Sequence, residues 1–243
     1  MTIDLDSPVP TLPVAEVFGP TWQGEGPSTG QLAAFIRLGG CNLTCRACDT
    51  PYTWDGTRYD LRKELAPMTA EAIVDVLPRA PLVVITGGEP TLYRSYLGMA
   101  RLLDLLAGQR VEVETNGTIN PDPIDRWPNV TFNVSPKLDG PMSVDPYEKR
   151  IVIPALRRYA HLARLRRAVF KIVVDGVDAV HAAFRLADEV DVPRDRLWIM
   201  PEGNTIAGTL STASTIADTV LAGRANLTLR QHVLVWPTVD RGR

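Results

Sequence analysis

The residues with the clearest chemical potential are three cysteines that lie in one short stretch. Cys41, Cys45 and Cys48 stand in "GGCNLTCRACDT" (39–50), and the 243-residue chain contains no other cysteine. An odd number of cysteines in one loop makes a poor disulfide framework, whereas closely spaced thiolates are good ligands for soft metals. We therefore expect a metal centre held by reduced thiols, with three buried, unliganded thiols as the structural alternative.

Two kinds of metal centre fit three thiolates. A structural zinc site wants four Cys or His ligands, and the histidines of this chain, at positions 161, 181 and 232, lie more than a hundred residues away from the cysteines. An iron–sulfur cube is normally held by four thiolates, so three leave one iron open to an exogenous ligand. An open iron turns an electron carrier into a site that can bind and reduce another molecule.

Strand-like and helix-like segments alternate along the chain and must position these cysteines. The predicted strands are residues 33–38, 82–86, 111–115, 130–135, 170–174, 197–201 and 232–236. The predicted helices are residues 69–77, 96–108, 155–168, 179–190 and 212–223. This alternation indicates βαβ units and a mostly parallel sheet. We expect an α/β fold, namely a partial (β/α) barrel of about six parallel strands.

Polar and glycine-rich phrases follow directly after most of the predicted strands. They are "GGC" after 33–38, "GGEP" after 82–86, "NGT" after 111–115, "PKLDG" after 130–135 and "EGNT" after 197–201. The carboxyl ends of parallel strands lie on one rim of the sheet, so these phrases should converge on the cysteine loop and form one site.

The overall composition limits the possible classes of partner. The chain has 26 basic and 28 acidic side chains, with 45% hydrophobic residues, which is typical of a globular protein without a strong charge bias. A basic nucleic-acid-binding domain is therefore not expected, and neither a signal peptide nor a membrane-spanning run is evident. We expect a single domain over residues 1–243 with a peripheral extension at 1–13, located in the cytoplasm, where thiols stay reduced.

The cysteine spacing, Cys-x3-Cys-x2-Cys after a strand, resembles that of the radical S-adenosylmethionine (SAM) enzymes. The resemblance implies a 4Fe–4S cluster on Cys41, Cys45 and Cys48, with SAM on the open iron and cleavage of SAM to a 5′-deoxyadenosyl radical. One departure is Ala47, since the position before the last cysteine is commonly aromatic in this superfamily.

Further segments resemble one branch, the 7-carboxy-7-deazaguanine synthases. They are "TWQGEGPSTG" (21–30), "FIRLGGCNLTCRACDT" (35–50), "TGGEPTLY" (86–93), "ETNGT" (114–118) and "NVSPKLDG" (133–140). The resemblance implies conversion of 6-carboxy-5,6,7,8-tetrahydropterin to 7-carboxy-7-deazaguanine with loss of ammonia, on the route to 7-deazapurines such as queuosine precursors. It also implies hydrogen abstraction at C6 of the pterin and a Mg²⁺ ion beside the substrate.

The branch resemblance assigns cofactor contacts to positions of this sequence. The residues expected at SAM are Ala47, Asp49, Gly88, Glu89, Glu114, Ser135, Pro136 and Lys137. Glycine at position 88 lets the backbone approach a ligand closely, and Glu89 is expected to partner the SAM ammonium group. Thr50 matches the Mg²⁺ ligand of the branch, and a hydroxyl is a suitable oxygen donor for this ion.

The residues expected at the substrate are Trp22, Gln23, Gly24, Glu25, Arg37, Thr86 and His232. Arg37 is costly to bury in "FIRL" without an anionic partner, and its planar guanidinium suits a carboxylate. Gln23 can donate to and accept from a pterin edge, and Glu25 can accept from its amino groups. The expected partners are the pterin, an electron donor such as flavodoxin or ferredoxin, and a second copy of the chain.

Two other functions remain open at this point. One is another small radical SAM enzyme, such as an activase that abstracts hydrogen from a protein glycine and binds a large polypeptide. The other is a non-catalytic metal-binding module, either stabilised by zinc or carrying electrons.

Overall fold

The computed structural model describes residues 9–140 and 144–237. Its strands are β1 (Thr11–Trp22), β2 (Leu32–Leu38), β3 (Ala66–Thr69), β4 (Leu82–Gly87), β5 (Arg110–Thr115), β6 (Val130–Val134), β7 (Ala168–Val174), β8 (Leu197–Pro201) and β9 (Asn226–Leu227). Its α-helices are α1 (Leu61–Glu64), α2 (Ala70–Val76), α3 (Leu97–Leu105), α4 (Tyr147–Arg150), α5 (Ile153–Arg164), α6 (Val177–Val190), α7 (Ile206–Ala222) and α8 (Gln231–Val235). Short 3₁₀ turns follow several strands, among them η1 (Gly26–Ser28), η2 (Pro51–Thr53) and η3 (Pro90–Tyr93).

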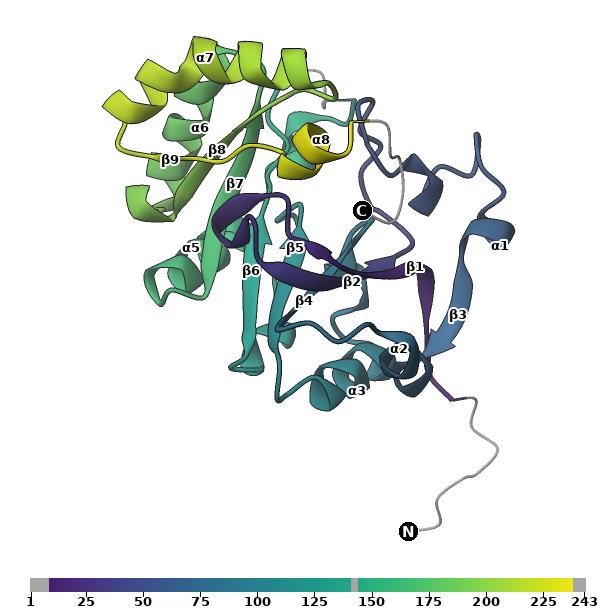
Figure 1. Cartoon of the computed structure of the whole chain (residues 1–243). Coiled ribbons are helices and arrows are strands. Elements are labelled where there is room, and N and C mark those ends of the chain that lie inside the picture. Colours follow the sequence, from purple (N-terminus) through teal and green to yellow (C-terminus); the bar gives the residue numbers. More distant parts are fainter. Residues whose placement is uncertain (1–8, 141–143, 238–243) are drawn as a thin grey trace.

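The strands form one sheet in the order β3-β1-β2-β4-β5-β6-β7-β8-β9. Every pair from β2 to β9 is parallel, while β1 pairs antiparallel with both β2 and β3. The sheet curves without closing, with α5, α6 and α7 along β7 and β8 and with α2 and α3 near β4 (Figure 1). The predicted partial barrel is confirmed, because β2, β4, β5, β6, β7 and β8 are the expected parallel strands and β9 adds a two-residue extension.

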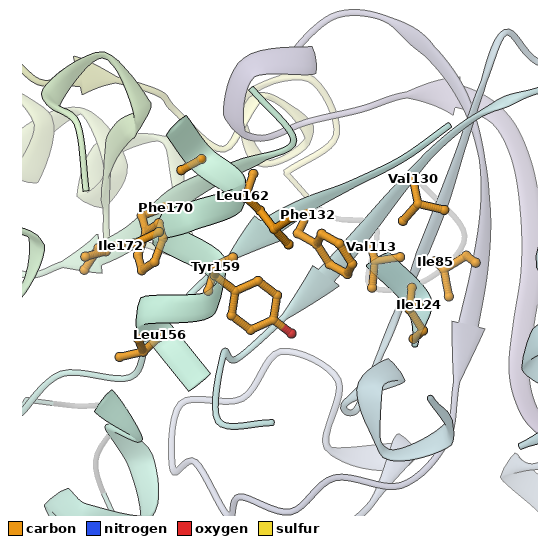
Figure 2. Close-up of a cluster of buried hydrophobic side chains, with 14 of the residues drawn as sticks. Ile85, Val113, Ile124, Val130, Phe132, Leu156, Tyr159, Leu162, Phe170 and Ile172 are labelled. Carbon is orange, nitrogen blue, oxygen red and sulfur yellow. The ribbon is translucent and has the colours of Figure 1, made fainter. Parts of the chain in front are cut away.

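Strand alternation gives the curved sheet two chemically different faces. The outer face packs against the helices through side chains such as Ile85, Val113, Phe132, Phe170 and Ile172, which Figure 2 shows around Tyr159 of α5. Side chains of successive strand residues point to opposite faces, so the residues between these apolar ones face the barrel interior. The inner residues include polar ones on neighbouring strands, listed from β2 to β7: Arg37, Thr86, Glu112, Glu114, Asn133 and Lys171.

The loop between β1 and β2 contacts the segment that follows β9, the last strand of the open sheet. Gly26 N donates to Thr228 Oγ1 at 2.9 Å, and Gln231 N donates to Gly24 O at 2.8 Å. Inside the barrel, Ser28 donates to Glu112 of β5. The segment "QGEGPSTG" is therefore held against the strands by buried hydrogen bonds and is not an ordinary surface loop.

All five predicted helices are present, although α5 ends at Arg164, where 168 was expected, and α7 begins at Ile206, where 212 was expected. Thr69, the first residue of the predicted 69–77 helix, is the N-cap of α2, and its hydroxyl accepts a hydrogen bond from Ala72 N at 3.1 Å. The helix α6 ends at Asp191, which adopts a left-handed φ of 65°. Within the part of the chain that the structure describes, no helix combines the length and apolar character needed to span a membrane.

The segment 232–236 is not a strand, and that prediction was wrong. Residues Gln231–Val235 form the helix α8, because the sheet already ends at the two-residue β9 and the chain then turns across the barrel opening. A short apolar run does not distinguish strand from helix by periodicity. The structure also places residues 11–13, within the extension expected to be peripheral, in the twelve-residue strand β1, where Leu12 is fully buried. Residues 1–8 of that extension lie outside the described residues.

Candidate active site

A cavity of about 690 Å³ opens at the carboxyl ends of the strands and reaches into the barrel. It lies within the roughly 300–1,000 Å³ range of small-molecule sites. Most of the residues that the sequence assigns to the site line this cavity. They are Trp22, Gln23, Gly24, Glu25, Arg37, Cys41, Cys45, Ala47, Cys48, Asp49, Thr50, Thr86, Gly88, Glu114, Ser135, Lys137 and His232. Glu89 and Pro136 are the two expected residues that do not line it. The segments that follow the strands therefore converge, as the parallel topology requires.

The three cysteines lie on a loop with no regular secondary structure that leaves β2 and returns to η2. Gly40 N donates to Thr53 O at 2.7 Å, while Leu43 N and Trp54 Nε1 each lie 3.4 Å from a cysteine sulfur, that of Cys41 and Cys48 respectively. Burial raises the pKa of Cys41 to about 12 and also raises that of Cys45. A metal binds the thiolate and displaces the thiol proton, so these groups can serve as ligands despite their raised pKa. The donor set therefore fits a metal cluster.

The three cysteines line the same cavity. Three thiolates that face one cavity suit the iron–sulfur cluster that the sequence predicts.

Glu89 has a different place from the one expected, because its carboxylate does not reach the cavity. It is completely buried and accepts hydrogen bonds from Thr91 N (3.0 Å), Thr91 Oγ1 (2.5 Å), Thr115 Oγ1 (2.7 Å) and Asn116 N (2.7 Å). Burial raises its pKa, while the four donors favour its ionised form. Glu89 thus ties the loop after β4 to the end of β5 and supports the cavity wall from behind.

Replacing Glu89 by Gln is expected to destabilise the protein by about 1–3 kcal/mol, because the amide N–H₂ of glutamine would face groups that themselves donate hydrogen bonds. The matched control is Glu71→Gln, which alters a half-exposed carboxylate that pairs with Arg101 at 2.6 Å and should change stability by less than about 0.5 kcal/mol. Urea unfolding of both variants measures the difference. Equal stability of the two variants would show that the buried network contributes little.

The end of β6 supplies a further part of the cavity wall. Ser135 N donates to Thr115 O at 2.7 Å, and Lys137 Nζ donates to Ser135 Oγ at 2.9 Å. Ser135 and Lys137 face the cavity, whereas Pro136 lies against a separate small hollow with Asp139 and Asp175. Pro136 therefore does not line the main cavity as its two neighbours do, because alternate residues of an extended segment face opposite sides.

The floor of the cavity is a partly buried cluster of charged residues around Glu25, with Lys171 fully enclosed. Lys171 donates to Glu25 Oε2, Arg230 Nε lies 3.2 Å from Glu25 Oε1, and His232 Nε2 lies 3.9 Å from the same oxygen. Burial opposes ionisation of Glu25, but the charges of Lys171 and Arg230 outweigh it and hold the pKa of Glu25 far below its usual value. Burial lowers the pKa of His232. Glu25 is thus a permanently ionised acceptor at neutral pH.

Glu114 belongs to this floor as well, although the sequence resemblance placed it at SAM. Gln23 Nε2 donates to Glu114 Oε1 at 3.2 Å, and Thr86 Oγ1 donates to Glu114 Oε2 at 2.7 Å. Both donors are residues expected at the substrate. Two side chains, from the β1–β2 loop and from β4, therefore meet on the Glu114 carboxylate of β5, and the structure groups Glu114 with residues that were expected at the substrate.

Arg37 lines the cavity but already has a carboxylate partner inside the protein. Its Nε donates to Glu16 Oε2 of β1 at 2.8 Å, and its guanidinium lies 5.4 Å from the centre of the Phe18 ring. The Tyr52 hydroxyl donates to the same Glu16 oxygen at 2.9 Å. The ion pair with this anchored carboxylate accounts for the burial of Arg37. Glu16 thus supplies part of the anionic environment that we expected around Arg37.

Thr50 and Asp49 follow the last cysteine and face the cavity in different ways. Thr50 precedes η2, but its hydroxyl does not cap that turn and instead lies 3.8 Å from Cys48 Sγ. Asp49 Oδ2 accepts from Arg230 Nη2 at 2.7 Å. Arg230 therefore bridges the cysteine loop and the floor, since it also contacts Glu25.

Some cavity residues were not assigned to the site from the sequence, among them Asn133, Lys171 and Arg230. Asn116, Glu202 and Asn204 also line the cavity, and they belong to the segments "NGT" and "EGNT" that were expected to converge there. Lys171 carried a usable signal, because a lysine inside the apolar strand "FKIVV" is as costly to bury as Arg37 inside "FIRL". Arg230 carried none, because it stands in a segment whose path across the barrel is decided by tertiary contacts.

A curved parallel sheet with a three-cysteine loop at its carboxyl-terminal rim defines the radical SAM class of protein. The family model described as "Radical SAM superfamily" matches residues 35–192. A 7-carboxy-7-deazaguanine synthase of Hyperthermus butylicus is 38% identical over 92% of both chains, and one of Pyrobaculum aerophilum is 32% identical over 95% of this chain and 97% of the relative. The crystal structure of QueE from Escherichia coli superposes with a TM-score of 0.67 at 28% identity, over 91% of this chain and 95% of that one.

The chain therefore belongs to the 7-carboxy-7-deazaguanine synthase family of the radical SAM superfamily. It is an enzyme that works with a 4Fe–4S cluster and SAM, and the non-catalytic alternatives are set aside.

Proposed function

We propose that this protein is a 7-carboxy-7-deazaguanine synthase, which converts 6-carboxy-5,6,7,8-tetrahydropterin to 7-carboxy-7-deazaguanine with loss of ammonia. The observation that carries the proposal is one cavity with three cysteines on its rim and an ionised, hydrogen-bonding floor below them. A small polar heterocycle fits such a floor, whereas a glycyl-radical activase needs to admit a large polypeptide. The product is a precursor for 7-deazapurines such as queuosine.

Cys41, Cys45 and Cys48 would hold the cluster, and SAM bound there supplies a 5′-deoxyadenosyl radical. Gly88, Ser135, Lys137, Ala47 and Asp49 surround the rim and are the residues we assign to SAM. The side-chain-free position 88 lets the backbone approach the cofactor, and Ser135 with Lys137 offers a hydroxyl and an ammonium group to its polar ends.

The floor residues would bind and orient the pterin. Glu25 and Glu114 present carboxylate oxygens to its amino and ring N–H groups, and Gln23 supplies an amide. Arg37 can offer its free guanidinium edge to the pterin carboxylate while Glu16 holds its Nε. Gly24 allows His232 to pack over the site, because a Cβ at position 24 would lie 2.2 Å from His232 Nδ1. Trp22 stacks on Trp236 with ring centres 5.4 Å apart and shields the opening from water.

Thr50 would ligate a Mg²⁺ ion, since its hydroxyl is turned toward the cavity and is not used as a helix cap. We further propose a cytoplasmic location, because an oxygen-sensitive cluster on reduced thiols suits that compartment. An electron donor such as flavodoxin or ferredoxin and a homodimeric assembly complete the proposal.

The deciding experiment is anaerobic turnover of the reconstituted protein. With SAM, reductant and the tetrahydropterin, mass spectrometry is expected to find 7-carboxy-7-deazaguanine, and deuterium placed at C6 of the substrate should appear in 5′-deoxyadenosine. Fully oxidised 6-carboxypterin has no hydrogen at C6 and serves as the matched control without product. Formation of 5′-deoxyadenosine without pterin conversion would retain the radical chemistry and refute the proposed substrate.

A further inference from the structure

Lys171 occupies the centre of the cavity floor and joins two carboxylates from separate elements. It lies on the inner face of β7 and is only 4% exposed. Its ammonium group contacts Glu25 Oε2 of the β1–β2 loop and lies 3.7 Å from Glu114 Oε1 of β5. The remaining oxygens are also oriented, Glu25 Oε1 by Arg230 and Glu114 Oε2 by Thr86.

The physical consequence of removing this lysine is specific. The partly buried carboxylates of Glu25 and Glu114 would lose the cation between them and repel each other more strongly, although Glu25 would keep its contact with Arg230. Such repulsion favours uptake of one proton by the pair. A protonated carboxyl group donates a hydrogen bond where the ionised group only accepts. The floor would therefore change from a pair of acceptors to a mixture of donor and acceptor.

We propose that Lys171 is a specificity-determining positioning residue, which holds Glu25 and Glu114 as paired acceptors and thereby selects a 2-amino-4-oxo pteridine over its 2,4-dioxo analogue. The inference rests on the proposed function, because it takes the floor to be the place of the pterin ring. In the 2,4-dioxo compound an oxygen replaces the amino group, so an acceptor would face the two carboxylates. An unpaired buried acceptor costs about 1–3 kcal/mol, which corresponds to roughly a tenfold to hundredfold preference.

The test compares the binding of 6-carboxypterin and 6-carboxylumazine to the reconstituted enzyme with SAM, followed by quenching of pteridine fluorescence under anaerobic conditions. The ratio of the two dissociation constants is expected to favour the pterin at least about tenfold in the unmodified enzyme and less than about threefold in Lys171→Met. The control Lys63→Met alters a side chain that is 83% exposed and should leave the ratio unchanged.

A second variant guards against a loss of folding. Glu25→Gln with Lys171→Met removes both charges of the closest ion pair, while Arg230 keeps Asp49 as a partner and Glu114 keeps the hydrogen bonds from Gln23 and Thr86. If Lys171 acts through Glu25, the ratio of the double variant should lie within about twofold of that of Glu25→Gln, whereas independent roles would multiply the two single effects. Multiplying effects would overturn the positioning role, and so would full pterin preference in a folded Lys171→Met enzyme.

The outcomes separate the two proposals. Cleavage of SAM in the absence of substrate should persist in Lys171→Met, because the ion-pair partners of this lysine lie in the floor and not on the cysteine loop. If the unmodified enzyme binds neither pteridine and converts no tetrahydropterin, the proposed function fails. If it converts the tetrahydropterin and both enzymes show the same preference, the inference about Lys171 fails and the proposed function stands.

Discussion

Replacing Cys45 by Ala is expected to lower the rate of SAM cleavage by at least about a thousandfold, because the cluster depends on three thiolates and the chain contains no fourth cysteine to replace one. Cys45 is half-buried, and its loss removes one small group from a loop with no regular secondary structure. The unfolding free energy of the metal-free protein should therefore change by less than about 1 kcal/mol. Iron and sulfide analysis, absorbance and 5′-deoxyadenosine formation measure the effect.

The control for this experiment lies in the same loop. Arg46 is exposed and directly follows Cys45, so Arg46→Ala perturbs the same segment while keeping all three thiols. We expect it to retain the iron content of the unmodified protein. Full SAM cleavage by Cys45→Ala, or an equal loss in both variants, would contradict the assignment of Cys45 as a cluster ligand.

The second large effect is expected from a single added methyl group at Gly88. A Cβ at this position would lie 1.9 Å from Gly40 O, 2.5 Å from Gly40 C and 3.2 Å from Cys41 Cβ. The backbone cannot relax easily, because Glu89 N donates to Gly40 O at 2.8 Å and Gly88 N donates to Leu38 O at 3.0 Å. Gly88→Ala should therefore displace the cysteine loop, lowering stability by about 3 kcal/mol, the upper end for overpacking, and SAM affinity by more than about tenfold.

Gly108 offers a matched control, since a Cβ there would meet no heavy atom within 4 Å. Gly108→Ala is expected to change stability by less than about 0.5 kcal/mol and to leave SAM binding unaltered. Thermal unfolding and equilibrium binding of SAM to the reconstituted variants distinguish the two positions. Normal SAM affinity in Gly88→Ala would show that the loop adapts and that the close contact with Gly40 is not required for the site.

The sequence by itself determined the fold class and the chemistry of the rim. Alternating strands and helices predict a parallel sheet, and parallel topology brings the segments after the strands to one edge. For this reason the sequence predicts that Cys41, Gly88 and Ser135 share one site although they are far apart in the chain, and all three line the same cavity. Their local motifs are short and contiguous, so the residues that carry the chemistry can be identified without knowing what packs around them.

Only the tertiary structure decided which polar residue meets which inside the barrel. Glu89 accepts hydrogen bonds from Thr115 and Asn116 and does not line the cavity. Glu114 contacts Thr86, a residue expected at the substrate, and residues 232–236 are helical where a strand was expected. The pairing of Lys171 with Glu25 joins positions 146 residues apart, and no local pattern specifies such a contact. The physical reason is that burial of a charge is decided by partners from other elements, and the curvature of the sheet selects those partners.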